Sequence, residues 1–329
     1  MIPSLLELSF FVSSILQTVS FQVTKPGRVV QCNGQVAENY SPVVGILAED
    51  CWAKADIKEG ASHIQASYVQ WAEQAGIRVV PVFLNRSQTY YAQVYKRVSG
   101  LILPGGGVIM NVGDYYNTTK LFLKWSSQDY LESGKQFPIW GTCMGFEVLA
   151  YILNGEKECR YFSYGTDGVS LPLNFTENVE KSRMFENAPG WLMETLRNKP
   201  ITANFHSRSI SKKFFESNSD MNATWNLLST NEDANGIVFV STVEHNLLPI
   251  YGSQWHPEKN QFVYAEVEDP VNHSVGAIRV MQYFADFFAN ELRKSCNVYP
   301  EEDFAKDQIW NYKIVYSLSS LNLKFYFDN

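Results

Sequence analysis

One cysteine in this chain of 329 residues is placed where a nucleophile would be exposed for attack. Cys143 lies in Gly141-Thr142-Cys143-Met144-Gly145, after an apolar run that predicts a strand and before a run that predicts a helix. Glycines on both sides allow a sharp strand-to-helix turn, and the start of a helix favours the reactive thiolate. The backbone N–H of Met144 would face an oxyanion on the attacked carbonyl. We interpret Cys143 as a nucleophile and Met144 as an oxyanion donor.

A thiol nucleophile needs a base, and the base needs an acceptor that orients it. The segment Gly252-Ser253-Gln254-Trp255-His256-Pro257-Glu258-Lys259 contains both residue types. His256 and Glu258 are two residues apart, so their side chains point the same way on an extended segment. His206, in Ala203-Asn204-Phe205-His206, is the other histidine of interest, either as a core residue or as a substrate contact.

A second glycine-rich segment, Leu103-Pro104-Gly105-Gly106-Gly107, follows another apolar run. Bare amides in such a loop would supply the second oxyanion donor, from Gly106 or Gly107, although an ordinary tight turn is the alternative. No Gly-Lys-[Ser/Thr] follows, which excludes a phosphate loop. The chain has no H-x-x-x-H or C-x-x-C spacing, and we predict neither a metal nor a cofactor.

Strands that alternate with helices would position these segments. Continuous apolar runs predict buried strands at 42–47, 78–82, 100–103 and 137–140. Helical spacing predicts helices at 61–75, 115–133, 145–153 and 275–292. This alternation predicts βαβ units and a parallel sheet with helices on both faces.

The rest of the chain adds strands and a tail. The region from 168 to 251 is more β-like, with strands expected at 236–242 and 248–252. One large domain, 21–297, is expected after a signal peptide at 1–20. The tail, 298–329, should pack on this domain, with an edge strand at its alternating aromatic and apolar residues Trp310, Tyr312, Ile314 and Tyr316.

Composition and charge narrow the class of protein. The chain is 45% hydrophobic and 19% charged, as in soluble globular proteins, and its net charge of −7 argues against binding to nucleic acid. The apolar N-terminus predicts a signal peptide, with a buried first strand or helix as the alternative, and no other membrane segment is expected. Five cysteines leave at least one thiol unpaired within the chain. Six N-x-[S/T] sequons predict a glycoprotein, at Asn39, Asn85, Asn117, Asn174, Asn222 and Asn272.

Together these segments resemble the class I glutamine amidotransferase-like superfamily, whose triad is Cys-His-Glu in that chain order. Several segments resemble the γ-glutamyl hydrolases in particular: 138–147, 171–176, 182–185, 203–206 and 254–260. The similarity extends from about Pro42 through Cys296 and more weakly into the tail. Two positions depart from the family: Arg208, where an aromatic residue is common, and His63, where a tyrosine is common.

The resemblance implies an α/β, flavodoxin-like three-layer sandwich with a mainly parallel central sheet. It also implies a secreted or lysosomal homodimer. The implied reaction is hydrolysis of γ-glutamyl amide bonds in small substrates, the folylpoly-γ-glutamates, by Cys143, His256 and Glu258. The implied substrate contacts are Glu147, His206 and Ser209.

Three other functions remain open on the sequence. The chain could hydrolyse a different γ-glutamyl metabolite, which the departures at Arg208 and His63 would allow. It could be a glutaminase that feeds ammonia to a synthetase, although the leader and the sequons argue against such a cytosolic role. It could also be a non-catalytic secreted binding protein of the same fold.

Overall fold

The computed structural model describes residues 31–32, 35–36, 39–51, 54–107, 109–264, 270–317 and 322–328. The predicted signal peptide, 1–20, lies outside the described residues. None of the helices described is long and apolar enough to cross a bilayer.

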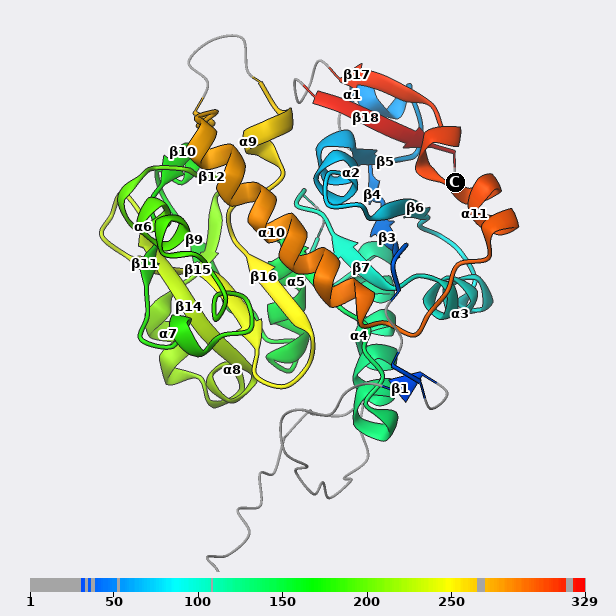
Figure 1. Ribbon diagram of the computed structural model, residues 1–329. Helices are drawn as coiled ribbons and strands as arrows, with labels where there is room; N and C mark the ends of the chain where they lie inside the picture. The colour runs from blue at the N-terminus through cyan, green and yellow to red at the C-terminus, as the bar shows by residue number, and fades with distance from the viewer. Residues whose placement is uncertain are drawn as a thin grey trace, which may run out of the picture.

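An eight-stranded sheet forms the centre of the molecule (Figure 1). Five of its strands are parallel: β3 (Val43–Leu47), β6 (Arg78–Val82), β7 (Gly100–Leu103), β8 (Ile139–Thr142) and β16 (Ile250–Ser253). They lie in the order β6-β3-β7-β8-β16, which is the 2-1-3-4-5 order of flavodoxin-like folds. Three antiparallel strands extend the sheet beyond β16: β15 (Val238–His245), β14 (Trp225–Glu232) and β11 (Asn174–Phe175).

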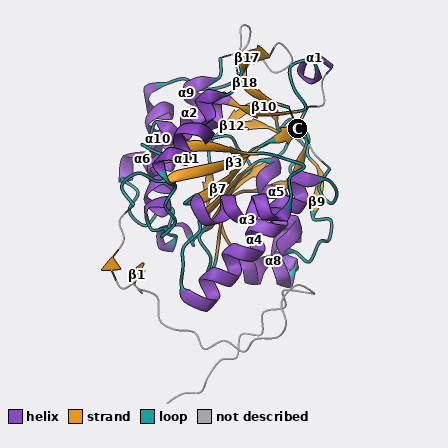
Figure 2. Ribbon diagram, turned by 90° about the vertical axis from the view of Figure 1, so that its right-hand side faces the viewer, coloured by secondary structure: helices purple, strands orange, loops and turns teal. Residues whose placement is uncertain are grey.

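Helices cover both faces of this sheet (Figure 2). One face carries α2 (Ala66–Glu73), α6 (Gly190–Asn198), α9 (Lys259–Phe262) and α10 (Val275–Arg293). The other carries α3 (Gln88–Arg97), α4 (Asp114–Ser133), α5 (Met144–Leu153) and α8 (Ser219–Thr224). The predicted three-layer α/β sandwich with a mainly parallel sheet is therefore confirmed.

Shorter elements complete the fold. The remaining strands are β1 (Gln31–Cys32), β2 (Gln35–Val36), β4 (Glu49–Asp50), β5 (Ser62–Gln65), β9 (Arg160–Phe162), β10 (Asp167–Leu171), β12 (Thr202–Phe205), β13 (Arg208–Ile210), β17 (Ile314–Ser317) and β18 (Asn322–Phe327). The remaining helices are α1 (Lys54–Ile57), α7 (Lys212–Ser217) and α11 (Glu301–Asp307), with short 3₁₀ turns at Val179–Lys181 and Ile309–Asn311.

Large aromatic side chains fix α2 and α10 against the middle of the sheet. Trp140 of β8 packs on Trp71 of α2 and Phe288 of α10, at ring-centroid distances of 5.3 and 5.8 Å. Trp255, just after β16, packs on Phe284 of α10 at 5.0 Å. Burial of each such side chain stabilises the fold by roughly 1.5–3 kcal/mol. The ends of β8 and β16 are therefore held by a rigid core.

A second sheet, of order β17-β18-β5-β4, joins the C-terminal strands to an early part of the chain. The predicted helix at 61–75 is wrong at its start, because Ser62–Gln65 pairs with β18 and β4 as strand β5 and the helix begins at Ala66. Lys324 of β18 forms a buried ion pair with Asp56, with a 2.9 Å contact between Nζ and Oδ2. The Tyr326 hydroxyl donates to the same carboxylate at 2.6 Å.

Candidate active site

The carboxyl ends of four neighbouring parallel strands carry the polar groups of the site. Glu49 follows β3, Gly105 follows β7, Cys143 follows β8 and His256 follows β16. In open α/β sheets, ligands bind in the crevice outside this edge, near the point where the strand order reverses. The fold thus brings the predicted nucleophile, glycine loop and base to one edge.

Cys143 occupies a strained turn between β8 and α5. Its φ of 51° and ψ of −113° lie outside the regions that most side chains adopt, at a cost of about 1–3 kcal/mol. The turn is held because the Cys143 N–H donates to Ser253 O at 2.7 Å and Cys143 O accepts from Glu147 N–H at 2.9 Å. The neighbouring glycines leave no room for a side chain: a methyl group on Gly145 would lie 2.1 Å from Leu103 O, and one on Gly141 would lie 2.7 Å from the Phe146 nitrogen.

Cys143 is 5% exposed, and its thiol lies beside two polar groups. Its Sγ is 3.9 Å from Phe205 O and 3.8 Å from Gln254 Nε2. Burial, and then the charge of Glu147, raises the thiol pKa well above its ordinary value, while the N–H of Met144 opposes this rise. The raised pKa favours a neutral thiol at rest.

The other cysteines differ from Cys143 in their surroundings. Cys51 and Cys159 carry free thiols whose pKa burial raises to about 12, and Cys296 is disulfide-bonded. Neither free thiol lies at the end of a parallel strand of the central sheet. Cys143 alone of the three combines a free thiol with the turn that follows β8.

His256 and Glu258 form a buried pair. His256 Nδ1 is 2.7 Å from Glu258 Oε1, and His256 Nε2 has no partner among the residues that the structure describes. Burial lowers the pKa of His256, against the opposing effect of Glu258. Burial alone would raise the pKa of Glu258, but the neighbouring histidine lowers it below its ordinary value. These two pKa shifts fit a neutral imidazole whose Nδ1–H donates to the Glu258 carboxylate.

Gly105 lies between the thiol and the imidazole. A methyl group at Gly105 would lie 2.8 Å from His256 Cε1 and 3.1 Å from Cys143 Cβ. Within the described part of the chain, no hydrogen bond joins the two side chains directly. Tyr68, which the sequence reasoning missed, connects the parts: its buried hydroxyl accepts from Gly105 N–H at 2.8 Å and lies 3.4 Å from His256 Nδ1. The signal available in the sequence was the segment Ala66-Ser67-Tyr68, which resembles a segment of the family.

Gly106 and Gly107, the predicted oxyanion donors, follow Gly105 in the chain and are exposed. Glu49 fills the space behind Gly106, because a methyl group there would lie 1.7 Å from Glu49 Oε2. Glu49 in turn pairs with His63 Nε2 at 3.0 Å. His63, one of the two departures from the family, therefore contacts the carboxylate that backs the loop. Which of the two glycines donates to an oxyanion stays a prediction.

Glu147, a predicted substrate contact, is buried, and both of its carboxylate oxygens accept hydrogen bonds from other residues. Its Oε1 accepts from Gln254 Nε2 at 3.0 Å, and its Oε2 accepts from Arg160 Nη1 at 3.1 Å. Arg160 also contacts Glu158 Oε1 at 2.9 Å. Burial raises the pKa of Glu147, although Arg160 opposes the rise. The sequence reasoning did not find Arg160, which has no motif around it.

Of the other predicted contacts, His206 lies in the loop from β12 to β13 and Ser209 lies in β13. His206 Nε2 is 3.0 Å from Asn204 Oδ1, and its Nδ1 is 3.0 Å from Arg208 O and 3.2 Å from Ser209 Oγ. Burial, and then His256, lowers the pKa of His206 to about 3. The lowered pKa favours a neutral imidazole. Both ring nitrogens have partners, and Ser209 is buried beside the ring. A direct contact with substrate stays a prediction for both.

The six sequons differ in exposure. Asn85, Asn117, Asn174 and Asn222 are exposed. Asn39 Nδ2 donates to Asn297 O at 3.1 Å, and Asn272 Nδ2 donates to Pro200 O at 2.9 Å. A glycan replaces one of the two amide hydrogens, so it would cost a hydrogen bond at Asn39, whose Nδ2 also donates to Ser99 Oγ at 3.2 Å.

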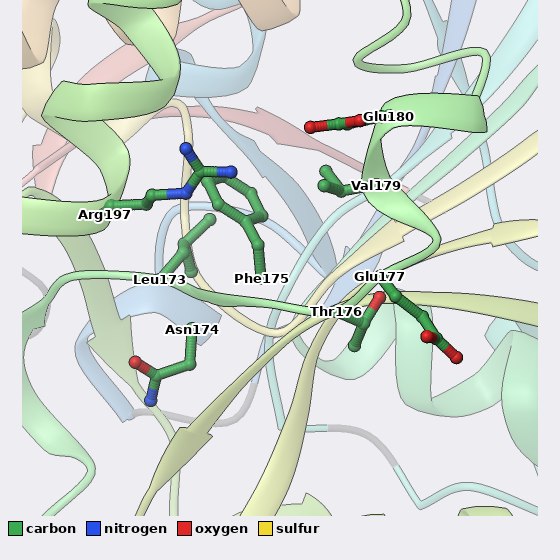
Figure 3. Close-up of a pocket in the computed structure, with 8 residues that line it drawn as sticks. All are labelled: Leu173, Asn174, Phe175, Thr176, Glu177, Val179, Glu180 and Arg197. Atoms are coloured by element: carbon green, nitrogen blue, oxygen red, sulfur yellow. The ribbon is translucent and has the colours of Figure 1, made fainter.

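A separate open cavity of about 710 Å³ lies beside β11 (Figure 3). Its lining residues are Leu173, Asn174, Phe175, Thr176, Glu177, Val179, Glu180 and Arg197. Arg197 covers the Phe175 ring at 5.2 Å. The cavity includes neither the thiol nor the buried histidine–carboxylate pair, so we place the site at the strand ends. No cluster of three or more His, Cys, Asp or Glu side chains suited to a metal ion occurs among the described residues.

The known proteins that this chain resembles in sequence belong to one family. The model of the class-I glutamine amidotransferase family matches residues 61–264. The chain is 39% identical over 290 residues to gamma-glutamyl hydrolase of Homo sapiens, covering 87% of this chain and 90% of that protein. It is 36% identical to gamma-glutamyl hydrolase B of Dictyostelium discoideum, covering 87% and 82%. It is 32% identical to gamma-glutamyl hydrolase 2 of Arabidopsis thaliana, covering 95% and 92%.

Similarity to solved structures is weaker. The glutaminase domain of Trypanosoma brucei CTPS with bound acivicin matches with a TM-score of 0.48 and 13% identity, covering 79% of this chain and 97% of that chain. A glutamine amidotransferase from Thermotoga maritima matches with a TM-score of 0.44 and 12% identity, covering 77% and 99%. Similarity at this level says nothing about the reaction of this chain.

Proposed function

Because the chain belongs to the class-I glutamine amidotransferase family and, within it, to the γ-glutamyl hydrolases, we propose that it hydrolyses γ-glutamyl amide bonds through Cys143, His256 and Glu258. One observation carries the proposal. The free thiol of Cys143 lies in a strained turn at the end of β8, and a buried histidine–carboxylate pair follows the adjacent strand β16. Nucleophile, base and orienting acceptor are the parts that thiol acyl transfer requires.

In the first half of the reaction, the thiol proton moves to His256 Nε2 as Sγ bonds to the side-chain carbonyl carbon of the γ-glutamyl unit. The carbonyl oxygen becomes an oxyanion, which the N–H groups of Met144 and of Gly106 or Gly107 stabilise. The C–N bond then breaks, and Nε2 returns the proton to the leaving amine. The product is a thioester on Cys143.

In the second half, water replaces the amine. His256 Nε2 takes a proton from the water, whose oxygen bonds to the thioester carbon. The C–S bond breaks, and the released thiolate recovers the proton from Nε2. Glu258 keeps the imidazole oriented and stabilises its charged form in both halves.

For the substrate, we propose folylpoly-γ-glutamates, in line with the family resemblance. A second candidate is another γ-glutamyl metabolite. It is favoured by the ion pair between Arg160 and Glu147, because this pair occupies the carboxylate that was expected to contact the glutamyl group. For location and assembly, we propose a secreted or lysosomal glycoprotein that forms homodimers, supported by the apolar N-terminus, the sequons and the family.

The test is product analysis on a γ-linked polyglutamate with purified protein. We expect shortened products from the wild-type chain and a loss of nearly all turnover in Cys143→Ala, because the nucleophile is removed. Cys159→Ala is the matched control, since it removes another buried free thiol away from the strand ends. Substantial turnover by Cys143→Ala would overturn the mechanism.

A further inference from the structure

A continuous set of polar contacts connects the nucleophile to the surface of the molecule. Gln254 Nε2 lies 3.8 Å from Cys143 Sγ and donates to Glu147 Oε1 at 3.0 Å. Arg160 Nη1 donates to the other oxygen of the same carboxylate at 3.1 Å. Arg160 Nε and Nη2 donate in turn to the two oxygens of Glu158, an exposed residue, at 2.9 and 3.0 Å. Arg160 therefore lies between an exposed carboxylate and the buried groups that surround the thiol.

The position of Glu147 makes its negative charge costly. Its side chain is 5% exposed, and a buried carboxylate must replace its lost hydration with a cation and hydrogen bonds. Burial raises the pKa of Glu147, and the charge of Glu158 acts in the same direction. Arg160, whose side chain is 14% exposed, is the strongest of the groups that oppose this rise. The ionised form of Glu147 therefore depends chiefly on Arg160.

An ionised Glu147 also determines how the Gln254 amide is turned. A carboxylate oxygen can only accept hydrogen bonds, so it requires the amide nitrogen on its side, and this nitrogen is also the atom that faces Sγ. A protonated Glu147 would be able to donate to an amide oxygen instead. Gln254 Oε1 is a buried acceptor that has no partner among the described residues. The amide would then turn over and place its oxygen, rather than an N–H, beside the sulfur.

The N–H that faces Sγ acts most strongly on a sulfur anion, because hydrogen bonds to a charged acceptor are about twice as strong as those between neutral groups. In the proposed reaction, the sulfur becomes a thiolate when the C–S bond of the thioester breaks. We propose that Arg160 is a positioning residue: it keeps Glu147 ionised, and this carboxylate turns the Gln254 amide so that an N–H supports the sulfur of Cys143. The inference rests on the proposed function for its effect on rate, whereas the ionisation of Glu147 is measurable without substrate.

Infrared spectroscopy tests the ionisation, because a carboxylate and a carboxylic acid absorb at different frequencies. At neutral pH, each enzyme is compared with the same protein carrying Glu147→Gln, which isolates the signal of Glu147. We expect a carboxylate in the wild type and in Arg160→Lys, which keeps a cation, and a protonated acid in Arg160→Met. Arg279→Met, at an exposed arginine of α10, is the matched control and should keep the carboxylate. A carboxylate in Arg160→Met would overturn the inference.

Kinetics on a γ-linked polyglutamate test the effect on the sulfur. We expect Arg160→Met to lower kcat by about tenfold, as for the loss of a hydrogen bond to a charged group. KM should not rise, because the defect lies in the reaction of the sulfur rather than in binding. Arg160→Lys should restore most of the rate. In the Glu147→Gln background, Arg160→Met should cause no further loss, because the carboxylate through which Arg160 acts is absent. A rise in KM without a fall in kcat, or equal losses in both backgrounds, would contradict the positioning role.

The inference and the proposed function fail in different ways. If the wild-type enzyme left the polyglutamate uncut while the infrared result was as expected, the proposed function would be wrong and the dependence of Glu147 on Arg160 would stand. If the wild type cleaved the polyglutamate and Arg160→Met cleaved it with the same kcat, Arg160 would have no positioning role and the proposed function would remain intact.

Discussion

At the scale of single residues, the buried thiol of Cys143 determines when its proton leaves. Burial raises the thiol pKa and lowers the pKa of His256, which favours the neutral form of both groups. In the proposed mechanism, the proton then moves to His256 while Sγ attacks the carbonyl carbon. A neutral His256 is the form that accepts it, which ties the rate to the pKa of this histidine.

We expect the acid limb of kcat/KM to lie below pH 6.5, the ordinary pKa of histidine. The base is neutral above its lowered pKa and is lost only as the pH falls through that value. Glu258→Gln removes a charge that raises the pKa of His256, so the limb should move to still lower pH. The rate should also fall by about a hundredfold or more, because the imidazole loses its orientation. A pH–rate profile of both forms checks this, and a limb above pH 6.5 in the wild type would contradict it.

A substitution at Gly145 tests why glycines flank the Cys143 turn. In Gly145→Ala, the added methyl would meet the Leu103 carbonyl at 2.1 Å, so α5 must shift away from β7. We expect a loss of about 1–3 kcal/mol in the free energy of unfolding and a displaced thiol. Urea unfolding and the rate of alkylation of Cys143 measure the two effects. Gly190→Ala, whose methyl would meet nothing within 4 Å, should leave both unchanged.

The candidate catalytic residues could be proposed at this scale because each lies in a local motif. Cys143 has its flanking glycines, and His256 and Glu258 are two residues apart. Glu49 and Arg160 were not predictable, because each reaches the site only through a tertiary contact. The segment Ala66-Ser67-Tyr68 was a signal for Tyr68, but not for the contact that this residue makes. The Tyr68 hydroxyl, for example, meets Gly105, 37 residues away in sequence.

At the scale of elements, local apolar periodicity predicted most of the parallel strands and the long helices α4 and α10. It failed at β5, where Ile64 continues the apolar spacing of α2 although the backbone pairs with β18. Its partner in β18 is Phe325, 261 residues later in the chain (325 − 64), so no local sequence pattern could predict this pairing. The short pairs β9–β13 and β10–β12, which form much of the site's edge, were missed for the same reason.

The buried ion pair between Asp56 and Lys324 should hold the second sheet together. We expect Lys324→Met to lower the free energy of unfolding by about 3–5 kcal/mol, because it leaves the Asp56 carboxylate buried without its charged partner. The double change Asp56→Leu and Lys324→Met should recover part of this loss. Urea unfolding of both variants measures the difference. If the double variant were no more stable than the single one, the charge would not be the cause.

At the scale of the whole molecule, the 2-1-3-4-5 strand order gathers groups from residues 49 to 258 at one edge of the sheet. Four of the six sequons have an exposed asparagine. For protein made through a secretory pathway, we expect glycans at Asn85, Asn117, Asn174 and Asn222, and lower occupancy at Asn39, where a glycan would cost a hydrogen bond. Glycopeptide mass spectrometry gives the occupancy of each sequon. Full occupancy at Asn39 in folded protein would contradict the expectation.

The pairing of β18 with β5 has a consequence for the timing of synthesis. His63 of β5 contacts Glu49, which backs Gly106, so the support of the glycine loop depends on a strand that is synthesised after all of these residues. A nascent chain would contain the proposed nucleophile, base and acceptor before this support exists. The enzyme should therefore gain activity only after β18 has been made and has docked, and a stop codon before β18 would release a chain with every proposed catalytic residue but without this support.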